Sequence, residues 1–120
     1  MVRIGHGEGP KTMPDYSFLA DLRRDVQIPR DGILSRTLFS GERLKAVVFG
    51  FDAGQELSEH TAAMPAVIHV LEGEAEILLG DDRHDAGPGT WIHMPAGLRH
   101  AVRARTPVVM LLLLLRSEAP

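Results

Sequence analysis

Residues 54–73 read GQELSEHTAAMPAVIHVLEG, and residues 89–104 read GTWIHMPAGLRHAVRA. Each of these segments holds two short apolar stretches separated by a turn rich in glycine or proline, which is typical of paired β-strands. Each segment also carries one histidine, His60 or His100, that strand alternation can direct toward a common interior. The two segments therefore predict a small β-barrel with a pocket inside.

The rhythm of short strands and turns continues on both sides of these segments. Turn signals recur at intervals of about 8–12 residues, which is typical of an all-β sandwich or barrel. Glu72-Gly73 lies between two of the expected strands and predicts a hairpin between them. The strands that we expect are 33–39, 44–51, 55–60, 66–71, 74–79, 83–85, 91–94, 99–105 and 108–115.

The chain of 120 residues fits one domain. We expect residues 31–117 to form the barrel. Residues 1–30 are expected to form a loosely held arm, followed over residues 17–26 by a short helix with Ser17 as N-cap or by an edge strand.

Composition excludes several classes of function. The net charge of −3 supplies no field that attracts nucleic acid or an anionic membrane, and without cysteine there is no thiolate chemistry. The N-terminal residues lack the apolar stretch of a secretory signal, so we expect a cytoplasmic protein.

The run VVMLLLLL over residues 108–115 is apolar throughout. It is far shorter than the roughly 20 residues that span a bilayer, so it predicts a strand buried on both faces. Its outer face then needs a cover, either the N-terminal segment or a second subunit. We therefore expect a homodimer.

Alternation places Val102 and Ala104 on the side of His100, whereas Arg103 and Arg105 point away, so the face of His100 is expected to be interior. An interior histidine either bonds to a backbone carbonyl as part of the core or faces a ligand or metal. Two such histidines, each beside a turn, favour a pocket as much as a core.

Together these residues resemble the two-part motif of the cupin superfamily, which consists of small jelly-roll β-barrels. In cupins the first part runs from a glycine across five residues to a histidine, a second histidine, a glutamate and a closing glycine. The second part has a glycine, a proline, a second glycine and a histidine. Gly54, His60 and Gly73 match the first part, and the second part is matched by Gly89, Pro95, Gly97 and His100.

The chain departs from this motif at the expected metal ligands. Metal-binding cupins use three histidines and a carboxylate, but Ala62 stands at the second histidine and Ala66 at the glutamate. The resemblance therefore leaves His60 and His100 as metal ligands, for a divalent transition metal that is weakly held or absent. Met64 could add a soft thioether ligand, although packing in the pocket is its simpler role.

Other polar side chains do not replace the missing ligands. Glu56 is expected on the same face as His60, but about 13 Å along the strand and so too far to share an ion. His69 and His93 are expected to meet on the outer face of one sheet, as a surface or interface pair.

The favoured function is binding of a small organic molecule, with no other cofactor. The alternative is a metal-dependent cupin enzyme of the oxygenase or isomerase class. The residues expected to line the pocket are Met64, Ile68, Ile92, Met94 and Val102.

Overall fold

The computed structural model describes residues 16–116, which fold almost entirely into β-strands. The strands of the described residues are β1 (Ile33–Ser40), β2 (Leu44–Phe51), β3 (Glu56–His60), β4 (Ala66–Glu72), β5 (Ala75–Leu79), β6 (Asp82–Ala86), β7 (Trp91–Met94), β8 (His100–Ala104) and β9 (Val108–Leu115). Each strand that the sequence predicts is present, with bounds that differ by at most two residues.

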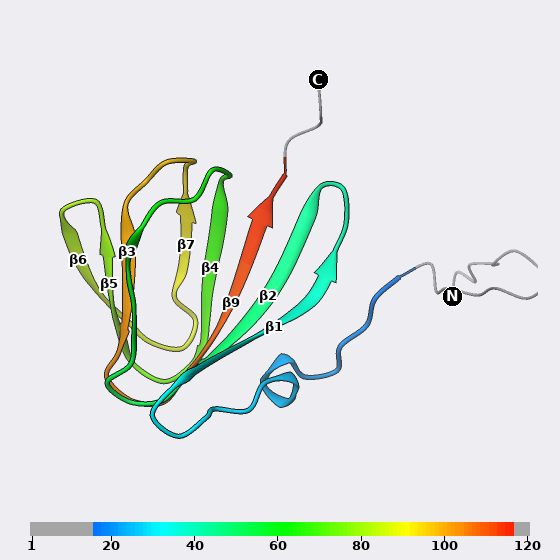
Figure 1. Cartoon of the computed structure of the whole chain (residues 1–120). Coiled ribbons are helices and arrows are strands. Elements are labelled where there is room, and N and C mark those ends of the chain that lie inside the picture. Colours follow the sequence, from blue (N-terminus) through cyan, green and yellow to red (C-terminus); the bar gives the residue numbers. More distant parts are fainter. Residues whose placement is uncertain (1–15, 117–120) are drawn as a thin grey trace, which may run out of the picture.

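The strands form two facing sheets (Figure 1). The larger sheet has the order β1-β2-β9-β4-β7, and the smaller has the order β3-β8-β5-β6. All the pairings are antiparallel. The fold is therefore an all-β jelly-roll barrel, as the sequence predicts.

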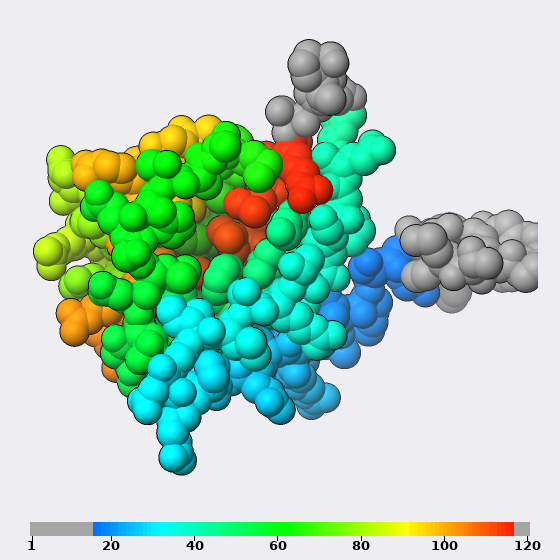
Figure 2. Space-filling model, viewed as in Figure 1, coloured from blue at the N-terminus to red at the C-terminus, as the bar shows by residue number. Residues whose placement is uncertain are grey.

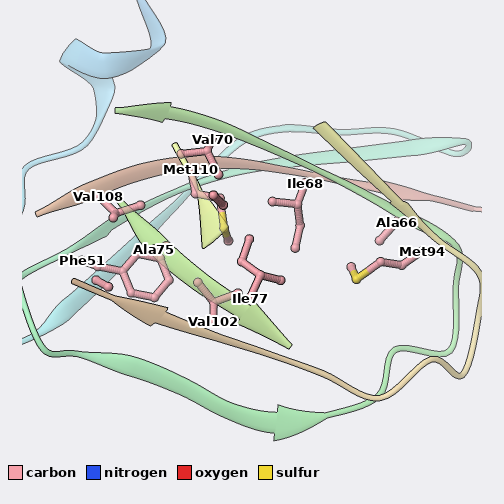
Figure 3. Packing of buried hydrophobic residues seen from close by; sticks show 12 residues of the cluster. Phe51, Ala66, Ile68, Val70, Ala75, Ile77, Met94, Val102, Val108 and Met110 are labelled. Atoms are coloured by element: carbon pink, nitrogen blue, oxygen red, sulfur yellow. The ribbon is translucent and has the colours of Figure 1, made fainter. Parts of the chain in front are cut away.

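The core lies between the two sheets (Figure 3). Phe51, Ile68 and Met110 come from the larger sheet, Ile77 and Val102 come from the smaller, and each is at most 1% exposed. Alternation explains the arrangement, because the residues next to these along each strand point to the outer faces. Polar side chains of the inner faces can therefore meet solvent only beyond this packed core.

The predicted hairpin at Glu72-Gly73 was wrong. β4 pairs with β7 and β9, whereas β5 pairs with β6 and β8, so the chain crosses from one sheet to the other at this turn. Gly73 has a φ of 85°, and a Cβ added there would lie 2.0 Å from the carbonyl oxygen of Pro107. A glycine with positive φ serves such a close crossing as well as it serves a hairpin.

The described part of the N-terminal region packs against the outer face of the larger sheet. Its only helical turn within residues 16–116 is a 3-10 helix at Leu22–Asp25, capped by Asp21 rather than by Ser17. The side chain of Asp21 accepts hydrogen bonds from Arg23, which lowers its pKa to about 2. Just after this turn, Val26 packs with Val48 and Val109.

The remainder of the expected N-terminal arm, residues 1–15, lies outside the described residues. Within residues 16–116, no helix has both the length and the apolar character needed to cross a membrane.

Candidate functional site

The two candidate histidines lie against each other at one end of the barrel. His60 is the last residue of β3 and His100 the first residue of β8, and the two are cross-strand partners. Their ring centroids are 4.2 Å apart, with the ring planes inclined at 57°. We call this end, bounded by the β3–β4 and β7–β8 connections, the barrel mouth.

Both rings are oriented by the backbone. Nδ1 of His60 lies 2.7 Å from the carbonyl oxygen of Ser58, and Nδ1 of His100 lies 3.0 Å from that of Leu98. A carbonyl oxygen only accepts, so each Nδ1 carries the hydrogen and the neutral ring keeps its lone pair on Nε2. Neither Nε2 atom has a hydrogen-bond partner in the described chain. Both are therefore available to a ligand.

The pair spans the boundary between core and solvent. His100 is 6% exposed and is the only buried polar residue among those described, whereas His60 is exposed. A ligand can thus approach along His60 and end against His100.

A bulge in β3 decides which side chains share the face of His60. The register pairs Leu57 with Val102 and His60 with His100, with a shift between Leu57 and His60. Because Val102 and His100 share the inner face of β8, Leu57 and His60 share the inner face of β3. Glu56 pairs with Arg103 and so lies on the outer face. The expectation that Glu56 shares the face of His60 was wrong, because simple alternation takes no account of the bulge.

The position of the family's glutamate is filled by apolar groups. Ala66 is the cross-strand partner of Met94, and the two lie side by side at one end of the core (Figure 3). Ala66 is 1% exposed and Met94 is 2% exposed. Two methyl-bearing side chains therefore occupy this wall of the mouth, where the motif would have a carboxylate.

The other residues expected to line the pocket divide into two groups. Ile68 and Val102 are each 1% exposed and form part of the closed core. Ile92 is half-buried at the edge of that core, and Met64 is half-buried in the β3–β4 connection. The accessible part of the candidate pocket is thus the mouth, near Met64, Ile92 and the histidine pair.

A second hollow, of about 370 Å³, lies outside the barrel and is lined by Gly54, Glu76, Arg103, Ala104 and Arg105. Arg105 bonds there to Glu76 at 3.0 Å and to Asp85 at 2.7 Å. These carboxylates raise the pKa of Arg105. The charge of Arg105 is therefore balanced within the protein, and this hollow lies on the outer face of the smaller sheet, apart from the histidine pair.

His69 and His93 do share the outer face of the larger sheet. His69 pairs with Trp91 and Val67 pairs with His93, so the two histidines are diagonal neighbours on β4 and β7. They lie on the face opposite to the core residues Ile68 and Met94. They are therefore separate from the mouth.

The four-ligand metal set of the cupin motif does not fit this chain. Only His60 and His100 of that set are present, and within residues 16–116 no group of three histidine, cysteine or acidic side chains could hold an ion. A structural or catalytic transition-metal site generally needs three or four protein ligands. Two imidazoles alone fit only a weakly held ion.

One polar residue of the inner face was missed from the sequence. Lys45 lies on β2 in alternation with Val47, Phe49 and Phe51, and Phe49 and Phe51 pack in the inner core. The spacing places Lys45 on the inner face, a signal that was present in the sequence but has meaning only once that face is known.

The fold and the histidine pair define a small jelly-roll barrel with a two-histidine mouth. Residues 47–114 match the family described as "Cupin domain", which is more than half of the chain, and the protein belongs to that family. No protein of curated function matches the chain.

Solved structures agree with this assignment. A conserved protein of unknown function from Streptococcus pyogenes is 34% identical, with a TM-score of 0.80, covering 91% of this chain and 100% of its own. A cupin superfamily protein from Desulfitobacterium hafniense is 26% identical, with a TM-score of 0.77 and coverage of 89% and 97%. An RmlC-like cupin protein from Desulfovibrio desulfuricans is 30% identical, with a TM-score of 0.70 and coverage of 86% and 96%.

Proposed function

We propose that the protein binds a small organic molecule at the barrel mouth, through His60 and His100. The observation that carries this proposal is the orientation of the pair. Each Nδ1 is held by a backbone carbonyl, which leaves two Nε2 atoms on adjacent rings without a partner. Preoriented polar atoms beside apolar walls are the usual composition of a small-molecule site.

The apolar wall supports an organic ligand over a tightly bound metal ion. Ala66 and Met94 stand where the cupin motif would have a carboxylate and its surroundings. A metal ion held at the mouth would have His60, His100 and water as ligands, and such a site would load weakly. The metal-dependent enzyme is therefore the less supported alternative.

We further propose that the protein is a homodimer that associates through the outer face of the larger sheet. Val67, Leu111 and Leu113 share this face, as the register of β4 with β9 shows. Trp91, at its edge, is 62% exposed. The N-terminal segment covers the part of this face near Val48 and Val109, so a second copy would cover the remainder.

The ligand proposal is tested by identifying small molecules that copurify with the untagged full chain. The native protein is compared with a His60→Ala/His100→Ala variant and with a matched His69→Ala/His93→Ala variant. Denaturing extraction followed by mass spectrometry gives the bound compounds, and the metal content is measured on the same samples.

A compound that is present in the native protein and in the His69/His93 variant but lost from the His60/His100 variant supports the proposal. Retention of that compound in all three proteins would contradict it. Stoichiometric metal that disappears only with His60 and His100 would favour the metal-dependent alternative.

A further inference from the structure

We infer that the ligand of the mouth is a small organic acid, and that the ammonium group of Lys45 binds its carboxylate. This inference rests on the proposed function and names the chemical class of the ligand. It is carried by the position of Lys45, by the charges around it, and by the cleft into which its face opens.

Lys45 lies in the same row of cross-strand partners as Ala66, the position at which the cupin motif has its glutamate. Its partner on β9 is Leu114, the partner of Leu114 on β4 is Ala66, and the partner of Ala66 on β7 is Met94. Cross-strand partners present their side chains on one face of a sheet. Leu114 and Met94 pack with the inner core, so Lys45 is on the inner face as well.

The spacing of this row brings Lys45 within reach of the mouth. Adjacent strands lie about 4.8 Å apart, so two steps place the Cα atom of Lys45 about 10 Å from that of Ala66. A ligand of a few heavy atoms, together with the long side chain of lysine, spans that distance. The ammonium group of Lys45 can therefore reach a small molecule that lies against Ala66 at the mouth.

The charge of Lys45 is not balanced within the described chain. Lys45 is half-buried, its side chain makes no hydrogen bond or ion pair there, and no acidic residue occupies its row. By contrast, Arg99 is paired with Glu59 at 3.2 Å and with Asp81 at 3.0 Å. A partly buried cation beside apolar side chains gains most from a partner of opposite charge.

Alanine in place of the family's metal ligands changes the charge that the protein presents at the mouth. A cupin with its glutamate at the position of Ala66 would present a carboxylate to the mouth, but this chain has none there. What remains is one ammonium group and two imidazoles, and none of these side chains carries a negative charge. The negative charge must then come from the ligand.

The inner face of β1, β2 and β9 is open to a ligand of this kind. In Figure 2 the orange and red atoms of β9 lie in a hollow between the green surface of β3 and β4 and the cyan surface of β1 and β2. Leu112 and Leu114 are the inner-face residues of this part of β9, and both are only half-buried. The floor of the cleft is thus apolar and suits the hydrocarbon part of an organic acid.

The test uses three carboxylates, acetate, benzoate and phenylacetate, each beside its uncharged amide. Binding to the full chain is measured by NMR, from the imidazole signals of His60 and His100 and from the lysine ammonium signals. The variants are Lys45→Met, which removes the charge, Lys45→Arg, which restores it, and Arg103→Met. Arg103→Met removes an equal charge from the outer face of the smaller sheet.

We expect at least one acid to bind about tenfold more tightly than its amide, because a charge-assisted hydrogen bond contributes that much. Lys45→Met should abolish the advantage, while Lys45→Arg and Arg103→Met retain it. Equal binding of acid and amide, or an unchanged advantage in Lys45→Met, would overturn the inference while leaving the histidine site intact. If no probe shifts the histidine signals, the proposed function fails together with the inference.

Discussion

His60 and His100 lie against each other as cross-strand partners, with ring centroids 4.2 Å apart, and Nδ1 of each ring bonds to the carbonyl oxygen two residues before it. The repeated i to i−2 contact fixes one tautomer on both rings. The backbone near each histidine therefore orients its ring, and no ligand is required for this orientation.

This orientation predicts the tautomer of each ring. At neutral pH the long-range proton–nitrogen NMR spectrum should show His60 and His100 protonated at Nδ1. His84, which is exposed in β6, serves as a reference within the same spectrum. Protonation mainly at Nε2 in either mouth histidine would contradict the account of the site.

Two glycines with nearly the same backbone angle should differ in their tolerance of alanine. Gly54 and Gly73 have φ values of 83° and 85°, but an added Cβ meets nothing at Gly54 and lies 2.0 Å from the Pro107 carbonyl oxygen at Gly73. Gly54→Ala should cost about 1–2 kcal/mol for its left-handed conformation. Gly73→Ala should cost at least about 2 kcal/mol more, because backbone must move.

Urea unfolding of the two variants measures this difference. Equal losses of stability would show that the crossing at Gly73 is looser than the structure indicates.

The proposed dimer gives a prediction for two neighbouring leucines. Leu113 pairs with Val67 on the outer face of the larger sheet, whereas Leu112 packs with the inner core. Leu113→Lys should therefore give a folded monomer, because it places a charge in the interface, and Leu112→Lys should destabilise the barrel.

Light scattering after gel filtration measures the oligomeric state. Leu78→Lys, on the outer face of the smaller sheet, is the matched control and should leave the dimer intact. A Leu113→Lys protein of unchanged size would exclude this face as the interface.

Stability in acid should depend on Asp52, which follows β2. Its side chain accepts hydrogen bonds from the backbone amides of Asp31 and Ala53, and these lower its pKa. A carboxylate with a lowered pKa in the folded state stabilises the fold above its unfolded pKa of about 4, and that stabilisation is lost as the pH falls further. Asp52→Asn should therefore reduce the unfolding midpoint in urea at neutral pH and weaken its dependence on acid pH.

The same measurement on Asp82→Asn provides the control, because the side chain of Asp82 is exposed and makes no hydrogen bond within the described chain. Identical acid profiles for the native protein and Asp52→Asn would contradict the assigned role.

Much of the fold could be predicted from the sequence, because the strands alternate regularly and glycine or proline marks their ends. Which strands pair with one another could not be predicted in the same way. Gly73 has the sequence of a hairpin turn, yet it connects two sheets, and the different pairing partners of β4 and β5 distinguish these cases. Local propensity describes a turn, whereas pairing depends on residues far along the chain.

The candidate site could also be predicted only in part. The inward direction of His60 and His100 follows from motif and alternation, but their contact depends on the bulge between Leu57 and His60. A bulge changes the face of every later residue in its strand and has no reliable signature in one sequence. Lys45 was missed for a related reason, since its row with Ala66 exists only after β9 has been inserted between β2 and β4.

The measurement that tests the account most directly is the metal content of the untagged full chain after saturation with a divalent transition metal. The native protein is compared with His60→Ala/His100→Ala and with Ala62→His/Ala66→Glu, which restores the motif. We expect little metal in the native protein after a desalting step and about one ion per chain in the restored variant. About one ion per chain in the native protein, lost with His60 and His100, would contradict it, because the missing ligands would then have been replaced by groups that the account does not recognise.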